Sequence, residues 1–224
     1  MINKTIKISI VINIITFILT IVAAIIMYTG FKFMGNDLPL ETSSIGMLRF
    51  FTVQSNLFMG LMSLIFAIKE ITILKNDKKE ISTFLYILKL MASVAVGVTF
   101  TTVVVYLGPM SPGGLISMFK NSNLFFHLII PVMGMANFAV FEKTNKLKFK
   151  YSFYGLVPTI LYAIFYLTNV IVHMENGKVS PIYDWYWFAQ GGISQICIVV
   201  PIMMFATCLI SIALWKFNKK VYNW

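Results

Sequence analysis

Six long runs of apolar residues dominate this 224-residue chain and limit what it can fold into. An α-helix needs about 20 predominantly apolar residues to cross the hydrocarbon core of a bilayer. Inside that core the backbone must satisfy its own hydrogen bonds, so an apolar segment of this length crosses as a helix. The sequence therefore predicts an all-α polytopic membrane protein, one membrane domain over residues 1–224 with six transmembrane helices. We expect these helices at about 8–31, 46–68, 83–107, 122–141, 152–173 and 189–215.

The lysines and arginines between the runs predict how the helices are oriented. Thirteen of the 18 basic residues lie at the two termini and in the second and fourth connections, and four lie in the alternate connections. Because cytoplasmic loops carry the excess of Lys and Arg, we expect the N-terminus and the C-terminus to be cytoplasmic. The remaining basic residue, Lys89, falls inside the third run and is expected to snorkel to the basic side.

The net charge of +10 follows from the same distribution. In a soluble protein a large positive net charge can indicate nucleic-acid binding. Here the charges lie in loops that face anionic lipid, so no nucleic acid is expected. The sequence predicts a multi-pass protein of the cell membrane, with membrane lipids and a lipid-like small molecule as its partners.

Polar side chains within the apolar runs are costly, so their spacing is informative. Residues three, four or seven apart share one face of a helix. On the second helix that face carries four polar residues, with Gln54 beside it: Arg49, Thr52, Ser55 and Asn56. At the same depth, the third, fourth and sixth helices carry Tyr106, Asn123, His127 and Gln190. We expect these side chains to line one cavity near the outer end of the bundle.

The acidic residues argue against several kinds of chemistry, because all eight are expected in connections or at helix ends. Proton- and sodium-coupled transporters usually place carboxylates within the membrane, so that class is not favoured. A Ser-His-Asp triad also needs a carboxylate beside its histidine. Two histidines without paired Cys or acidic ligands do not form a metal site, and the chain has no phosphate loop or dinucleotide fingerprint. Neither a metal nor a cofactor is predicted.

A hydroxyl and an imidazole remain as reactive groups on the expected cavity. His127 is the one imidazole within the interior of an apolar run. A threonine becomes a nucleophile when a base accepts its proton, and a neutral histidine does this near pH 7. Thr52 and His127 are therefore the candidate nucleophile and general base for acyl transfer. Candidate oxyanion or substrate-binding residues are Arg49, Gln54, Ser55, Asn56, Tyr106, Asn123 and Gln190.

An aromatic segment, YDWYWF at 183–188, precedes the last run. Tyr and Trp are enriched where a membrane meets water, so this segment is expected to form an outer interfacial belt. An aromatic gate over a substrate is the alternative reading.

The stretches FFTVQSNLF and NLFFHLIIPVMG resemble those of a bacterial six-helix family known as Pr-six-Pr membrane proteins. More distantly, the chain resembles the androgen-induced and androgen-dependent integral membrane hydrolases of animals. That resemblance implies hydrolysis of fatty acid esters of hydroxy fatty acids, with Thr52 and His127 at the positions of the reactive threonine and histidine. The polar run Gln54-Ser55-Asn56 departs from the animal pattern.

The predicted function is a membrane-embedded hydrolase or acyltransferase that acts on lipid or fatty-acid esters near the outer leaflet. Two alternatives stay open. The polar cavity also suits a non-enzymatic binder or transporter of a small amphiphile. The polar residues also suit an accessory membrane subunit, in which they only pack helices together.

Overall fold

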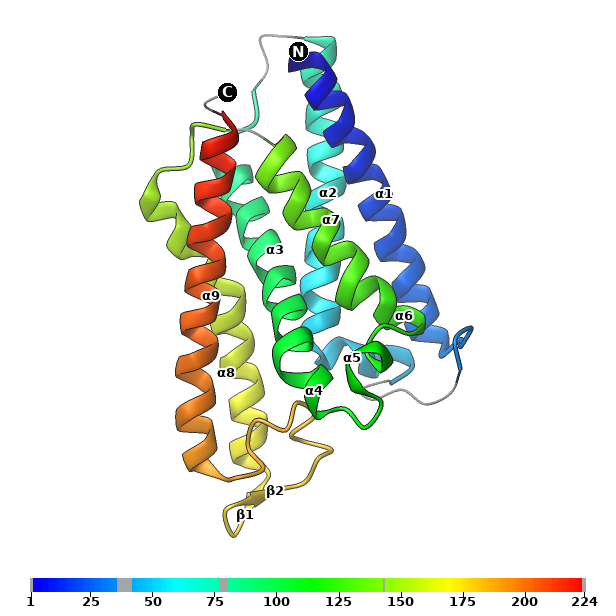
Figure 1. Ribbon diagram of the computed structural model, residues 1–224, viewed down its shortest axis with the longest axis vertical. Coiled ribbons are helices and arrows are strands. Elements are labelled where there is room, and N and C mark those ends of the chain that lie inside the picture. The colour runs from blue at the N-terminus through cyan, green and yellow to red at the C-terminus, as the bar shows by residue number, and fades with distance from the viewer. Residues whose placement is uncertain (1, 36–41, 77–79, 143, 223–224) are drawn as a thin grey trace.

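A computed structural model describes residues 2–35, 42–76, 80–142 and 144–222, and it confirms the all-α membrane architecture (Figure 1). Within these ranges, six helical segments are long and apolar enough to cross a membrane. They are Lys4–Thr29, Phe51–Lys75, Thr83–Met110, Asn121–Phe141, Phe149–Val172 and Ile193–Lys219.

The spans are assembled from α-helices joined in places to 3₁₀ or π turns. The first span contains α1 (Ile2–Thr29). The second contains α2 (Phe51–Lys75), which follows the 3₁₀ helix η1 (Ser44–Arg49). The third contains α3 (Thr83–Thr102), which continues through η2 (Val103–Leu107) into α4 (Gly108–Met110). After α5 (Gly114–Ser117), the fourth consists of α6 (Asn121–Leu124), η3 (Phe125–Ile129), α7 (Ile130–Ala136) and η4 (Asn137–Phe141). The last two contain η5 (Phe149–Leu156) with α8 (Val157–Val172), and α9 (Ile193–Tyr222), separated by a hairpin of β1 (Met174–Glu175) and β2 (Lys178–Val179).

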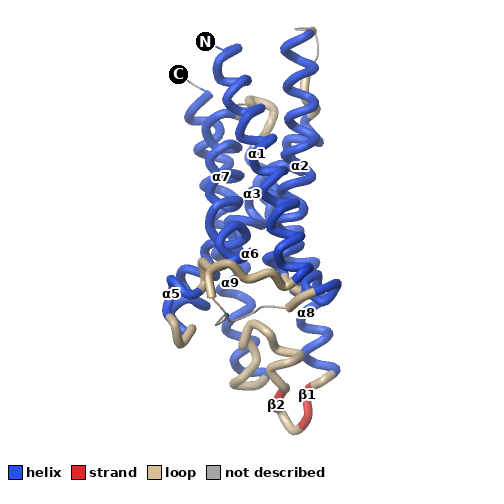
Figure 2. Tube along the Cα trace, turned by 90° about the vertical axis from the view of Figure 1, so that its right-hand side faces the viewer, coloured by secondary structure: helices blue, strands red, loops and turns tan. Residues whose placement is uncertain are grey.

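Helix α3 lies at the centre of the bundle and is the most buried of the six spans. It packs against α2, α7 and α9, while α1 covers α2 and the fourth span (Figures 1 and 2). Both chain termini lie at one end of the bundle, called here the termini end, and the β1–β2 hairpin lies at the opposite, hairpin end (Figure 1). The orientation prediction requires the two termini to share a side, and its cytoplasmic assignment rests on the basic residues alone.

The two π turns nearest the hairpin end precede prolines. Pro109 follows η2, and Pro131 follows η3. A proline has no N–H to donate to the carbonyl four residues earlier, and its ring clashes with that carbonyl. A widened π turn accommodates such a break while the chain stays helical. His127 lies in the π turn η3, so its ring direction differs from that of a regular α-helix.

Helix α9 is attached to the bundle mainly through its C-terminal part. The Asn218 amide donates to the Phe138 carbonyl (2.7 Å) and to the Glu142 carbonyl (2.8 Å). The Trp215 indole N–H donates to the Leu147 carbonyl (2.9 Å), and the Ser211 hydroxyl donates to a carbonyl in η5. Helices α8 and α9 belong to the two least buried spans, so they form an outer pair beside a tighter core.

Two span boundaries differ from the predicted ones and move candidate residues off their helices. The membrane helix α2 begins at Phe51, so Arg49 ends the separate 3₁₀ helix η1. The last span begins at Ile193 instead of about 189, which leaves Gln190 in a turn before α9. The Tyr162 hydroxyl of α8 binds the Arg49 carbonyl before α2. Before α9, the Ala189 N–H is bound by Asp184 of the same connection.

Candidate functional site

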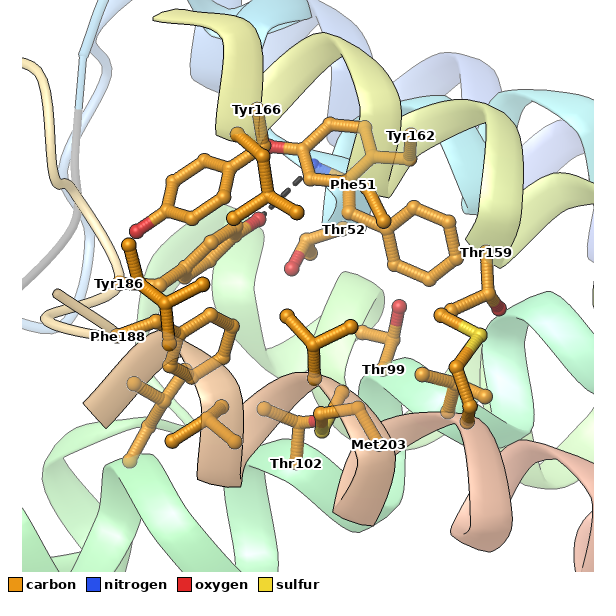
Figure 3. Close-up of a pocket in the computed structure, with 18 of the residues that line it drawn as sticks. Phe51, Thr52, Thr99, Thr102, Thr159, Tyr162, Tyr166, Tyr186, Phe188 and Met203 are labelled. Carbon is orange, nitrogen blue, oxygen red and sulfur yellow. Dashed lines mark hydrogen bonds between the residues drawn. The ribbon is translucent and has the colours of Figure 1, made fainter. Parts of the chain in front are cut away.

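A pocket of about 70 Å³ lies toward the hairpin end, between the core helices and the outer pair (Figure 3). Its wall is mostly aliphatic and aromatic, with four threonines and three tyrosines. Residues from α2, α3, η2, α8, α9 and the 183–188 segment line it: Phe51, Thr52, Val98, Thr99, Thr102, Val103, Leu107, Thr159, Tyr162, Ala163, Tyr166, Leu167, Tyr186, Phe188, Ile196, Val199, Val200, Met203 and Met204.

Thr52 reaches this pocket because tyrosines hold the first turn of α2. The Phe51 N–H is at the start of the helix and has no acceptor within it, so it donates to the Tyr186 hydroxyl (2.8 Å). The Tyr162 hydroxyl donates to the Arg49 carbonyl (2.7 Å). The Thr52 side chain then points its hydroxyl into the pocket and is 8% exposed (Figure 3). This places the predicted nucleophile on a wall that is otherwise largely apolar.

Other threonines of the pocket differ in how well they are paired. The Thr99 hydroxyl lies 2.9 Å from the Ser55 hydroxyl, so these two groups satisfy each other. The Thr159 hydroxyl is buried and has no hydrogen-bond partner. Leaving a buried polar group unpaired costs about 1–3 kcal/mol, a cost that a polar ligand in the pocket would remove.

The YDWYWF segment is folded into the protein, so the prediction of an interfacial belt is wrong for its central residues. Asp184, Trp185 and Tyr186 are buried, at 0%, 6% and 5% exposure. The Tyr186 ring lies 5.8 Å from the Tyr166 ring, and Phe188 also lines the pocket. The segment closes the pocket toward the hairpin end, as the alternative reading of an aromatic gate requires.

Asp184 is the reason that this segment turns inward. Its carboxylate accepts a hydrogen bond from the Tyr166 hydroxyl. It also accepts from the N–H groups of Phe188 and Ala189, and each of these two nitrogens lies 3.0 Å from a carboxylate oxygen. The Gln190 amide donates to the same carboxylate at 2.6 Å. A buried carboxylate is tolerated when several donors surround it. Gln190, a predicted substrate-binding residue, thus uses its amide within this turn.

Tyr106 is also engaged with the closing segment. Its hydroxyl donates to the Trp187 carbonyl (3.1 Å), and its ring lies 5.2 Å from that of Phe188. Trp187 has a φ of +58°, in the left-handed region that bulky residues seldom adopt. Hydrogen bonds from Tyr106 and from the Gln195 amide (3.0 Å) to the Trp187 carbonyl hold this conformation. Tyr106 therefore supports the pocket from outside its lining.

His127 is buried in η3, at 2% exposure. Its Nδ1 lies 2.8 Å from the Met118 carbonyl, which can only accept, so Nδ1 carries the proton and Nε2 the lone pair. His127 is not among the residues that line the Thr52 pocket. Asn56 connects the two places, because its amide donates to the carbonyls of Thr52 (2.7 Å) and Phe126 (2.9 Å). Asn56 thus connects the backbone of Thr52 to the residue that precedes His127. The His127 side chain itself lies outside the pocket that Thr52 lines.

The remaining candidates lie around this core. Gln54 and Ser55 line a second hollow of about 250 Å³ on the other side of Phe51 and Tyr162, and the Gln54 amide donates to the Leu48 carbonyl (2.7 Å). The Arg49 guanidinium carbon lies 5.4 Å from the centre of the Trp185 ring, a cation–π distance. Asn123 is buried, and its amide nitrogen has no partner.

A group of charged residues near the termini end corrects two expectations. Lys89 does not snorkel to water: its side chain is fully buried and its Nζ lies 3.1 Å from a Glu142 carboxylate oxygen. Glu70, inside α2, is also buried and bonded to Ser9 of α1. The argument that no carboxylate lies within the membrane-spanning part is therefore wrong, and it no longer counts against a proton-coupled function. A lysine six residues into an apolar helix was the one sequence signal for this group.

Comparison of the chain with protein-family models, with curated proteins and with solved structures gave no match. The resemblance to the Pr-six-Pr and animal hydrolase families stays a prediction from two motifs. The geometry around Thr52 and the buried charges are thus the grounds on which function is argued.

Proposed function

We propose that the protein is a membrane-embedded hydrolase or acyltransferase for lipid or fatty-acid esters, with Thr52 as the nucleophile. The observation that carries this proposal is the Thr52 hydroxyl, which faces an apolar pocket between membrane helices (Figure 3). An acyl chain is the chemical class that suits aliphatic and aromatic walls at this depth. An ester carbonyl beside the chain would meet Thr52.

His127 is the proposed base. The Thr52 oxygen attacks the ester carbonyl carbon, His127 Nε2 takes the hydroxyl proton, and the departing alcohol receives that proton. Water, or an acceptor alcohol in a transferase, then releases the acyl group from the threonine. The proposal requires His127 to reach Thr52 when substrate is bound, and the Asn56 bridge keeps the two segments adjacent.

The pocket must widen for such a substrate. An apolar cavity of about 150 Å³ holds one benzene molecule, and this pocket measures about 70 Å³. The outer pair α8 and α9 forms one side of it and is the least buried part of the bundle. Outward movement of this pair is the route by which the pocket can accept a chain from the membrane.

The test is labelling of membranes with a fluorophosphonate probe, together with hydrolysis of a fluorogenic fatty-acyl ester. Thr52→Ala should lose labelling and hydrolysis, and Thr52→Ser should keep both. His127→Ala should lower hydrolysis by about 10²–10⁴-fold, the usual contribution of a general base. The matched control is Thr102→Ala, another threonine of the same wall, which should label like wild type. Wild-type labelling of Thr52→Ala would exclude the threonine as nucleophile.

A second candidate is a non-enzymatic binder or transporter of a small amphiphile. It is favoured by the unpaired Thr159 hydroxyl in the wall and by the position of His127 outside it. The measurement that separates the two is thermal stabilisation by a non-hydrolysable amphiphile. Stabilisation that persists in Thr52→Ala, with no ester hydrolysis by wild type, supports the binder.

A further inference from the structure

The buried group near the termini end centres on Lys89 of α3. Its Nζ donates to Asn13 Oδ1 (2.7 Å), to Ser63 Oγ (3.1 Å) and to Glu142 Oε1 (3.1 Å). An ammonium has three N–H groups, and three acceptors surround this one. Lys89 is therefore charged and fully satisfied, and no room remains for a metal cation in its place.

A second carboxyl group, that of Glu70, is linked to this ammonium and to Glu142 through Asn13. Glu70 accepts from the Ser9 hydroxyl (2.6 Å) and from Asn13 Nδ2 (3.2 Å), and the same nitrogen lies 2.9 Å from Glu142 Oε1. All of these side chains are at most 5% exposed. Two carboxylates so close together in a buried site repel each other, so one of them retains a proton.

The two oxygens of Glu142 have different surroundings, which indicates where that proton lies. Oε1 receives three donors, from Lys89, Asn13 and Asn137 (3.0 Å). Oε2 is buried and has no partner among the described residues, and neither has Oδ1 of the Asn137 amide that donates to Oε1. Both of these unpaired atoms are acceptors when the carboxyl is ionised. A proton on Oε2 supplies the missing donor.

We propose that this group is a proton-binding site, in which Glu142 Oε2 carries one proton and donates it to Asn137 Oδ1. Glu70 then remains the carboxylate that balances Lys89, and the site is electrically neutral. Because the residues come from α1, α2, α3 and the end of the fourth span, the bound proton holds these helices together. Glu142 directly follows Phe141, the last residue of its span, so the site lies near the termini end of the bundle. The proposal is independent of ester hydrolysis.

Titratable and charged groups face the Glu142 carboxyl from several packed elements. Besides Lys89 and Glu70, Tyr86 of α3 faces both carboxyls among the residues that the structure describes. Helix α1 contributes Ser9 and Asn13, and α9 contributes Asn218, none of which titrates. Burial raises the pKa of the Glu142 carboxyl above its usual value, although the nearby Lys89 ammonium acts in the opposite direction.

The sign of the expected pH effect follows from this direction. A carboxyl whose folded pKa is raised stabilises the fold at low pH, and the contribution is lost as pH rises from the ordinary carboxyl value through the folded one. The full-length protein in detergent should therefore melt at a lower temperature as pH rises through the folded pKa of Glu142. Infrared spectra of the same sample near neutral pH should contain a protonated-carboxyl C=O band that shifts in D₂O.

Three variants test the assignment. Glu142→Gln places an amide N–H where the proposed O–H lies, so it should remove both the infrared band and the alkaline fall in melting temperature, while keeping a folded protein. Glu70→Gln removes the carboxylate whose repulsion keeps Glu142 protonated, so Glu142 should ionise beside Lys89 and the band should weaken. Glu80→Gln, at an exposed carboxyl of the same end, is the control and should resemble wild type.

Two results would overturn the proposal. A band that persists in Glu142→Gln places the proton on Glu70. A wild-type spectrum with no protonated-carboxyl band, together with melting that does not depend on pH, shows that the group binds no proton. If Glu142→Gln does not fold, Asn137→Leu decides, because Asn137 contacts the Glu142 carboxyl. A C=O band that shifts in this variant belongs to Glu142, and an unshifted band places the proton on Glu70.

Discussion

The two ends of the bundle treat buried polar groups in opposite ways. At the hairpin end, the Tyr166 hydroxyl, the Gln190 amide and two backbone N–H groups surround Asp184, and a pocket remains beside them. At the termini end, Lys89, Glu70 and Glu142 are tightly interlocked with amides and hydroxyls from four segments. The hairpin end has a pocket beside a few polar groups, which suits a ligand. The termini end has closely packed charged groups and no pocket among those described, which suits stabilisation of the bundle and proton binding.

The largest effect is expected for Lys89→Met. The substitution leaves two buried carboxyl groups without their cation, and removing one partner of a buried ion pair costs about 3–5 kcal/mol. Thermal unfolding in detergent measures the loss. The double variant Lys89→Met with Glu70→Gln should recover part of it, and Lys148→Met, at an exposed lysine, should change little. A Lys89→Met protein as stable as wild type would show that the charges do not lock this end.

Asp184→Asn should have the next largest effect, at the other end. An asparagine amide nitrogen cannot accept from the N–H of Ala189 or from Gln190, so charge-assisted hydrogen bonds worth about 1.5–3 kcal/mol are lost. The melting temperature should fall, and trypsin should cleave more readily at Lys178, close to this segment. Glu175→Gln, at an exposed carboxyl of the hairpin, is the matched control. An unchanged melting temperature would mean that Asp184 does not hold the closing segment.

Thr159→Val should act in the opposite direction and more weakly. The valine has nearly the same shape and removes a buried hydroxyl that lacks a partner, so stability should rise by up to about 1 kcal/mol. Thermal unfolding without ligand measures this gain. The same variant should bind an amphiphile less tightly if the hydroxyl faces the ligand. A loss of stability without ligand would show that the hydroxyl is already paired.

The smallest effect is expected at the exposed pair of Glu80 and Lys146, whose charged atoms lie 2.7 Å apart. The hydrogen bond from Lys146 lowers the pKa of Glu80. A lowered carboxyl pKa contributes stability above the usual carboxyl range and loses it as pH falls through the folded value, the reverse of the Glu142 effect. Melting curves of Glu80→Gln should thus differ from wild type only slightly and only at acidic pH. A difference at alkaline pH would contradict this assignment.

The sequence was informative where local physics decides the structure. Apolar runs longer than a bilayer crossing become helices whatever packs beside them, so six spans were predictable. The i, i+3 and i, i+4 rule also placed Thr52 on a polar face of α2, and its hydroxyl does face a pocket. The inward fold of YDWYWF was not predictable, because it depends on Asp184 meeting Tyr166 of another helix.

The charged group escaped prediction for a related reason. Glu142 stands at the end of an apolar run, where a charge normally reaches water, and nothing nearby in the sequence indicates that it is buried. Its partner Asn13 lies 129 residues away along the chain. A single sequence has no signal for such a pair, since the local cost of burying each residue is visible and the compensating contact is not.

The uneven attachment of α9 has a consequence for how a molecule enters from the membrane. Ser211, Trp215 and Asn218 fasten the end of this helix that lies nearest the buried charges, and Ile196 to Met204 form a wall of the pocket. Within that wall, Pro201 removes a backbone hydrogen bond from the helix. The N-terminal half of α9 has fewer polar attachments than the C-terminal half, so displacing it would cost less. We therefore expect a molecule that enters from the membrane to displace the N-terminal half of α9, while the C-terminal half stays bonded to the bundle.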